Sequence, residues 1–157
     1  KKLEILYEQN RVKREDFDVI WELKQKKTNE IIEKTASSDE SKKRLHEGTK
    51  SFKKICVTNS IQQTALLMLK KTGQLSFMDH VISNEDVNNP KPDPEGYLKA
   101  IQYLQLQPNE CLIVEDSPKG IEAAKKSNAH VYEVKGYNDV TLENVLNIIN
   151  NFNVDSK

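Results

Sequence analysis

Residues 112–120, Leu-Ile-Val-Glu-Asp-Ser-Pro-Lys-Gly, decide the fold of this chain. The apolar run at residues 111–114 has no helical periodicity, which predicts a buried β-strand. The serine and proline that follow suit the N-cap and the first turn of a helix. Glu115 and Asp116 therefore fall at the carboxyl end of a strand, directly before a helix. In open α/β sheets this is the edge that binds ligands.

The two adjacent carboxylates of Glu115 and Asp116 also indicate a chemistry. Two such charges side by side repel each other unless a cation or a lysine compensates them. Carboxylate oxygens are hard ligands of the kind that Mg²⁺ prefers. The alternative from this segment alone is a helix-capping Asp beside a solvated Glu.

The composition excludes several classes of partner. The chain has 157 residues with 24 basic and 24 acidic side chains, so it carries no net charge and no nucleic acid partner is expected. No apolar run approaches the length of a membrane span, so no membrane segment is expected either. Cys56 and Cys111 lie in apolar strand-like runs, which is typical of reduced thiols in a cytoplasmic protein.

The chain divides into two zones by pattern. Residues 1–38 are charged and helical in periodicity, whereas residues 39–157 alternate between strands and helices. Strands are expected at residues 54–57, 80–82, 111–114 and 130–133, and helices at residues 61–71, 94–103, 118–126 and 142–150. Strands separated by helices of this length predict right-handed crossovers and a doubly wound, Rossmann-like parallel sheet.

Two more strand ends carry polar side chains. Thr58 and Asn59 follow the first predicted strand, and a hydroxyl, an amide and a helix N-terminus together can bind an anion. Lys91 lies in a loop with three prolines, which leaves that loop little conformational entropy to lose. Each feature has an ordinary alternative, a helix cap for the first and a solvated lysine for the second.

The order Thr58, Lys91, then Glu115 with Asp116, each after its own strand, resembles the haloacid dehalogenase superfamily of phosphohydrolases. The match to its β-phosphoglucomutase and phosphoglycolate phosphatase branch is close over residues 114–124. The resemblance implies that Thr58 and Lys91 are catalytic and that Thr58, Asn59 and Lys91 bind phosphate. It also implies that Asp116 and Glu115 bind Mg²⁺ as the cofactor.

The resemblance further implies that residues 1–38 are a partial helical cap and that residues 39–157 are an α/β core without its first strand. In this family that strand ends in an Asp-x-Asp motif whose first aspartate attacks phosphorus. The chain has a single Asp-x-Asp, Asp16-Phe17-Asp18, and its context predicts the first turn of a helix. We therefore expect the chain to be inactive alone, with the nucleophile supplied by a missing N-terminal segment or a second chain.

The function implied is a Mg²⁺-dependent phosphatase or phosphosugar mutase that acts on a small phosphorylated metabolite through an aspartyl-phosphate. The alternative is a degenerate, non-catalytic binding module of the same superfamily. A metal-free dehalogenase of 2-halo acids is disfavoured by the acidic pair. A phosphoryl-accepting receiver is disfavoured because its acidic pair lies on the first strand and its lysine comes last.

Overall fold

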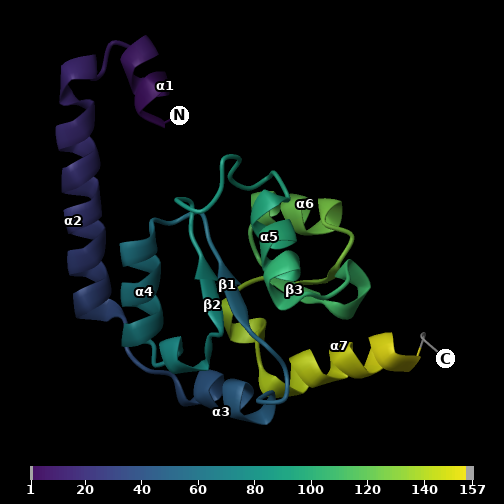
Figure 1. Ribbon diagram of the computed structural model, residues 1–157. Helices are drawn as coiled ribbons and strands as arrows, with labels where there is room; N and C mark the ends of the chain where they lie inside the picture. The colour runs from purple at the N-terminus through teal and green to yellow at the C-terminus, as the bar shows by residue number, and fades with distance from the viewer. Residues whose placement is uncertain (1, 155–157) are drawn as a thin grey trace. The chain divides into compact units, whose positions relative to one another are not determined.

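The computed structural model describes residues 2–154 (Figure 1). Contacts divide the chain into two units, Lys1–Ala36 and Ser37–Lys157. The first unit consists of α1 (Lys2–Glu8), a short 3-10 turn and α2 (Phe17–Thr35), which confirms that this part of the chain is helical. None of the helices within residues 2–154 is long and apolar enough to cross a membrane.

The second unit has the predicted alternation of strands and helices. Its strands are β1 (Ile55–Val57), β2 (His80–Ile82), β3 (Leu112–Glu115) and β4 (His130–Glu133). Its helices are α3 (Glu40–Gly48), α4 (Gln62–Lys71), α5 (Glu95–Leu104), α6 (Pro118–Lys126) and α7 (Leu142–Val154). The boundaries agree with the sequence to within one residue, except that α7 continues past its predicted end at residue 150.

The strands form two parallel pairs. In one pair Cys56 of β1 lies opposite Val81 of β2, and in the other Ile113 of β3 lies opposite Val131 of β4. Within the described part of the chain no strand joins β1 to β3, so the sheet is split where one continuous sheet was expected. The architecture is nonetheless α/β with parallel strands, as the sequence predicts.

Each pair therefore has open edges, among them the side of β1 away from β2 and the side of β3 away from β4. The Thr58 amide donates to the Ile82 carbonyl across the first pair. Because the main-chain groups of successive residues alternate in direction, the carbonyl of Val57 points to the open edge of β1. The Val134 amide likewise donates to the Glu115 carbonyl across the second pair. The main-chain carbonyl of Val114 therefore points to the open edge of β3.

Helices cover both sides of the strands and create two apolar clusters. One cluster joins Ala65 and Leu69 of α4 to Val81. The other lies beside α5 and α6 and is built around Tyr97, Ile113, Ala123 and Ala124. Cys56 packs against the first and its neighbour Val57 against the second, which is the alternation of a strand between two helical layers (Figure 1).

Local signals in the sequence explain where the helices begin and end. Ser117 caps α6, and its Oγ accepts a hydrogen bond from the Gly120 amide at 3.1 Å. The Asp93 carboxylate accepts from the Glu95 amide at 2.9 Å, although α5 begins one residue later than predicted. Gly73 after α4 has φ +72°, a conformation that glycine adopts without strain.

Both cysteines are free and half-buried. Burial raises the pKa of the Cys56 thiol and of the Cys111 thiol above the ordinary value. Both therefore remain protonated near neutral pH.

Candidate active site

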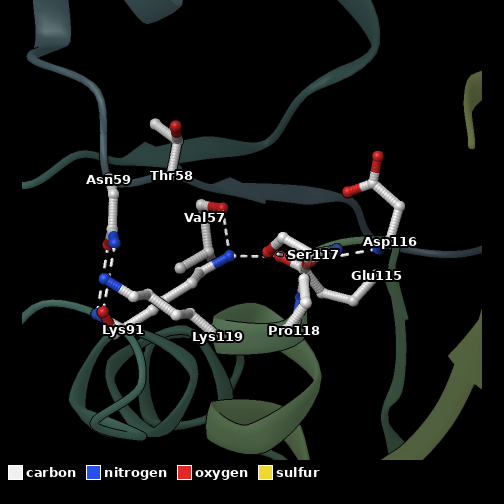
Figure 2. A pocket seen from close by; sticks show the side chains of 9 residues that line it. All are labelled: Val57, Thr58, Asn59, Lys91, Glu115, Asp116, Ser117, Pro118 and Lys119. Carbon is white, nitrogen blue, oxygen red and sulfur yellow. Dashed lines mark hydrogen bonds and ion pairs between the residues drawn. The ribbon is translucent and has the colours of Figure 1, made fainter.

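The five residues singled out in the sequence lie around one pocket. It has a volume of about 500 Å³ and opens at the carboxyl ends of β1 and β3 (Figure 2). Thr58 and Asn59 come from the end of β1, Lys91 from the loop before α5, and Glu115 and Asp116 from the end of β3. The remaining lining residues are Val57, Ser117, Pro118 and Lys119.

A buried ion pair forms the floor of this site. Lys91 Nζ lies 2.5 Å from Glu115 Oε1, and the two side chains are only 9% and 11% exposed. The same ammonium donates to the main-chain oxygen of Val57 at 3.0 Å and to the Tyr97 hydroxyl at 2.7 Å. Lys91 therefore links the open edge of β1 to the acidic end of β3.

Glu115 is held through both of its carboxylate oxygens. Oε1 accepts from Lys91 and from the Tyr97 hydroxyl, the latter at 2.8 Å. Oε2 accepts from the Asp116 amide at 3.1 Å and from the amide and hydroxyl of Ser117 at 3.1 and 3.0 Å. The carboxylate also lies against Gly120, where an added Cβ would overlap its atoms.

These contacts set the charge of Glu115. Burial raises the pKa of its carboxyl, but the hydrogen bonds from Lys91 and Tyr97 and the charge of Lys91 lower it by more. The net pKa lies below the ordinary value, so Glu115 stays ionised at neutral pH. The Tyr97 pKa is raised, first by burial and then by its bond to Glu115, so the phenol stays protonated.

Two polar side chains hold the loop that carries Lys91. The Asn59 amide forms a reciprocal pair with the Lys91 main chain, accepting from its N–H at 3.1 Å and donating to its carbonyl at 3.3 Å. The Glu95 carboxylate accepts from the amides of Asn88 and Asn89 at 3.0 and 2.8 Å. Lys99 and these two amides lower the pKa of Glu95 to about 2. The loop is therefore fixed from both sides.

The side chains of Thr58 and Asp116 differ from those of Lys91 and Glu115 because they keep free hydrogen-bonding capacity. Thr58 Oγ1 accepts from the Ser60 amide at 3.1 Å, which leaves its hydroxyl hydrogen able to donate. Asp116 is exposed, and no side chain or amide within residues 2–154 donates to its carboxylate. Figure 2 shows the Thr58 hydroxyl and the Asp116 carboxylate both directed away from the Lys91–Glu115 pair.

The two acids that the sequence predicts as metal ligands, Glu115 and Asp116, differ in whether their carboxylate oxygens are available to a metal ion. All favourable positions on Glu115 are taken by protein donors, whereas Asp116 has both oxygens available. No group of three or more His, Cys, Asp or Glu side chains in the described residues could by itself hold a metal ion. Mg²⁺ commonly uses one or two carboxylates together with waters and phosphate oxygens, and Asp116 fits that use.

Sequence reasoning missed Tyr97 and Gly120. Tyr97 lies in the first two turns of α5, six residues after Lys91, and its apolar ring made it indistinguishable from an ordinary core residue. Gly120 lies inside the predicted helix over residues 118–126, where glycine is unfavourable unless a close contact requires it, and no such contact was predicted. A glycine within a predicted helix was therefore the signal that another group packs closely against this position.

The single Asp-x-Asp has no strand context in the structure. Asp16 ends the 3-10 turn before α2 and Asp18 lies in the first turn of that helix, and both side chains are exposed. This confirms the predicted helical placement of the motif.

The family model for haloacid dehalogenase-like hydrolases matches residues 2–134. The chain belongs to this family. This chain is 35% identical over 89 residues to a phosphoglycolate phosphatase of Nitrosospira multiformis. The aligned region covers 56% of this chain and 39% of that protein. It therefore spans less than half the length of this curated relative.

Solved structures agree with the assignment to the haloacid dehalogenase-like hydrolases. A protein described as a beta-phosphoglucomutase from Thermotoga maritima has 28% identity and a TM-score of 0.60, over 71% of this chain and 58% of that one. A family hydrolase of Entamoeba histolytica has 20% identity and a TM-score of 0.74, over 93% of this chain and 77% of that one. The second likeness concerns the fold alone.

Proposed function

We propose that this chain carries the phosphate- and metal-binding half of a Mg²⁺-dependent phosphatase or phosphosugar mutase. The observation that supports it most directly is the meeting of Thr58, Lys91, Glu115 and Asp116 at one pocket on the carboxyl ends of parallel strands. The proposed substrate is a small phosphorylated metabolite, in keeping with the phosphoglycolate phosphatase and beta-phosphoglucomutase named among similar proteins.

The roles follow from the hydrogen bonding. The Thr58 hydroxyl donates to a phosphoryl oxygen, and the Lys91 ammonium balances the charge on the phosphoryl group. Asn59 positions Lys91 through its main chain and keeps one amide hydrogen for the phosphate. Glu115 holds Lys91 charged and in place.

Asp116 is the proposed protein ligand for Mg²⁺, with Glu115 close enough to add to the negative potential there. When bound, the cation offsets charge on the phosphoryl oxygens. The residues of this chain bind and orient the substrate, whereas displacement at phosphorus needs a carboxylate nucleophile.

That nucleophile is proposed to come from outside residues 1–157, on a strand that lies beside β1. The split sheet supports this idea, because β1 and β3 each have an open edge at the pocket. Asp16 and Asp18, the alternative within this chain, lie at the end of a 3-10 turn and in the first turn of α2, not at the end of a strand. We further propose that residues 1–38 form part of a cap and residues 39–157 the core.

Metal binding is the first test. Replacing Asp116 with alanine is expected to weaken Mg²⁺ or Mn²⁺ binding by at least about 10-fold, the loss typical of removing even an outer-shell partner. Titration calorimetry with inorganic phosphate present measures it. Asp18→Ala is the matched control, since Asp18 is an exposed aspartate in α2, and it should leave the titration unchanged. Equal titrations for wild type and Asp116→Ala would refute the metal assignment.

Turnover is the second test. With Mg²⁺ and an aryl phosphate, the wild-type chain is expected to match a Lys91→Ala variant at the level of the buffer blank, because the carboxylates that line the pocket among the described residues, Glu115 and Asp116, are proposed to hold Lys91 and the metal. Release of the aryl alcohol by wild type above Lys91→Ala would mean that residues 1–157 contain the nucleophile.

A non-catalytic binding module is the second candidate. It is favoured by the same helical placement of Asp16 and Asp18. The two candidates are distinguished by assaying this chain joined to a strand that carries the nucleophile: a phosphatase hydrolyses phosphate esters in an Asp116-dependent manner, whereas a binding module binds them and leaves them intact.

A further inference from the structure

The Lys91 ammonium is saturated before any ligand binds. An ammonium group has three hydrogens. Its three acceptors in this structure are the Val57 carbonyl, the Tyr97 hydroxyl and Glu115 Oε1, at 3.0, 2.7 and 2.5 Å. A phosphate oxygen can receive a hydrogen bond from Lys91 only if one of these acceptors gives way.

The three acceptors differ in what their release would cost. Giving up Glu115 would separate a buried ion pair, which is strongly unfavourable. Giving up Val57 would leave a main-chain carbonyl at the open edge of β1 without this donor. Tyr97 is neutral, and after losing the hydrogen bond from Lys91 it would still donate to Glu115 at 2.8 Å. Tyr97 is therefore the acceptor that yields at least cost.

We propose that the Tyr97 hydroxyl accepts the hydrogen of Lys91 that a phosphate oxygen would otherwise receive, so that Tyr97 positions Lys91 when no phosphate is bound and competes with phosphate for that hydrogen. This inference rests on the proposed role of Lys91 as the phosphate-binding cation. It adds a positioning residue that acts through Lys91 and tunes the affinity of the pocket for phosphate.

Packing of the Tyr97 ring keeps its hydroxyl beside Lys91. Tyr97 is 6% exposed, and its ring belongs to the apolar cluster with Ile113, Ala123 and Ala124. The ring cannot turn out of the site, so the hydroxyl remains within reach of Lys91 whether or not phosphate is bound. Its raised pKa keeps the hydrogen that it donates to Glu115.

The test is a titration with inorganic phosphate at fixed Mg²⁺. Tyr97→Phe is expected to bind phosphate about tenfold more tightly than wild type, because no hydrogen bond to a charged group is displaced. Tyr103→Phe makes the same change on the exposed side of α5 and should match wild type. A role of Tyr97 in packing alone would leave the affinity equal or lower, and either result overturns the inference.

A second measurement uses the wild-type chain itself. Phosphate binding should change the near-ultraviolet absorbance of tyrosine, and the change should persist in Tyr103→Phe. Its absence in wild type that binds phosphate overturns the inference. If Lys91→Met binds phosphate as well as wild type, or wild type binds none, the proposed function fails and this inference with it. If Lys91→Met loses binding while Tyr97→Phe is no tighter, this inference fails by itself.

Discussion

Replacing Lys91 with methionine is expected to lower the free energy of unfolding by about 3–5 kcal/mol at neutral pH, the usual cost of leaving a buried charge without its partner. The change keeps most of the apolar stem but leaves Glu115, 11% exposed, without the ammonium that compensates it. Chemical denaturation of both proteins measures the difference.

Two further variants show whether the lost partner causes this effect. Lys126→Met removes the exposed i,i+4 pair with Glu122, and its cost should stay below about 1 kcal/mol. Combining Lys91→Met with Glu115→Gln removes the uncompensated charge, so the double variant should be more stable than Lys91→Met. A double variant no more stable than the single one would contradict this explanation.

The Lys91–Glu115 ion pair also predicts that acid affects wild type and Lys91→Met in opposite directions. The stability of wild type should fall, whereas that of Lys91→Met should recover. In wild type the pKa of Glu115 is lowered, so its contribution to stability is complete above the ordinary value of 4.5 and is lost as the pH falls through the lowered value. In Lys91→Met the ammonium no longer opposes burial, the largest influence on this carboxyl, so we expect its pKa to be higher than in wild type and acidification from pH 7 to neutralise the buried carboxylate sooner. The stability difference between the two proteins should therefore shrink as the pH falls toward 4.5.

Gly120→Ala is expected to destabilise the chain by about 1–3 kcal/mol through overpacking and to weaken phosphate and metal binding. At an ordinary helical position the same change gains about 0.5–1 kcal/mol. Here the new methyl group would overlap the Glu115 carboxylate and push it away from Lys91 and Ser117. Denaturation and the phosphate titration measure the two effects.

Gly136→Ala is the matched control, because nothing lies within 4 Å of a Cβ built at that position. It should leave both stability and phosphate binding near the wild-type values. In a Glu115→Ala background the obstacle is gone, so adding Gly120→Ala there should cost nothing. A persistent cost in that background would show that some other contact opposes the methyl group.

Most of the fold could be predicted from local patterns. Short apolar runs, caps such as Ser117 and turn residues such as Gly73 each act within a few residues, so the sequence contains their effect directly. The gathering of Thr58, Lys91 and Asp116 could also be predicted, because parallel strands bring their carboxyl ends to one edge.

The different hydrogen bonding of Glu115 and Asp116 could not be predicted in the same way. Glu115 and Asp116 are neighbours with the same charge, yet Glu115 accepts hydrogen bonds on both oxygens whereas no donor to Asp116 lies among the residues that the structure describes. This difference depends on Tyr97 and Ser117 reaching one oxygen each, which is a matter of tertiary distance. The lack of pairing between β1 and β3 could not be predicted either, because the sequence of a strand does not determine by itself which strand it pairs with.

The open edges of β1 and β3 have a consequence for how this chain behaves among other molecules. Unpaired strand edges act as templates on which extended segments of other polypeptides can add. Self-association of the isolated chain at high concentration should therefore proceed by strand addition at the unpaired edges of the two pairs, those of β1 and β3 among them. A peptide that offers a matching apolar strand should keep the chain monomeric.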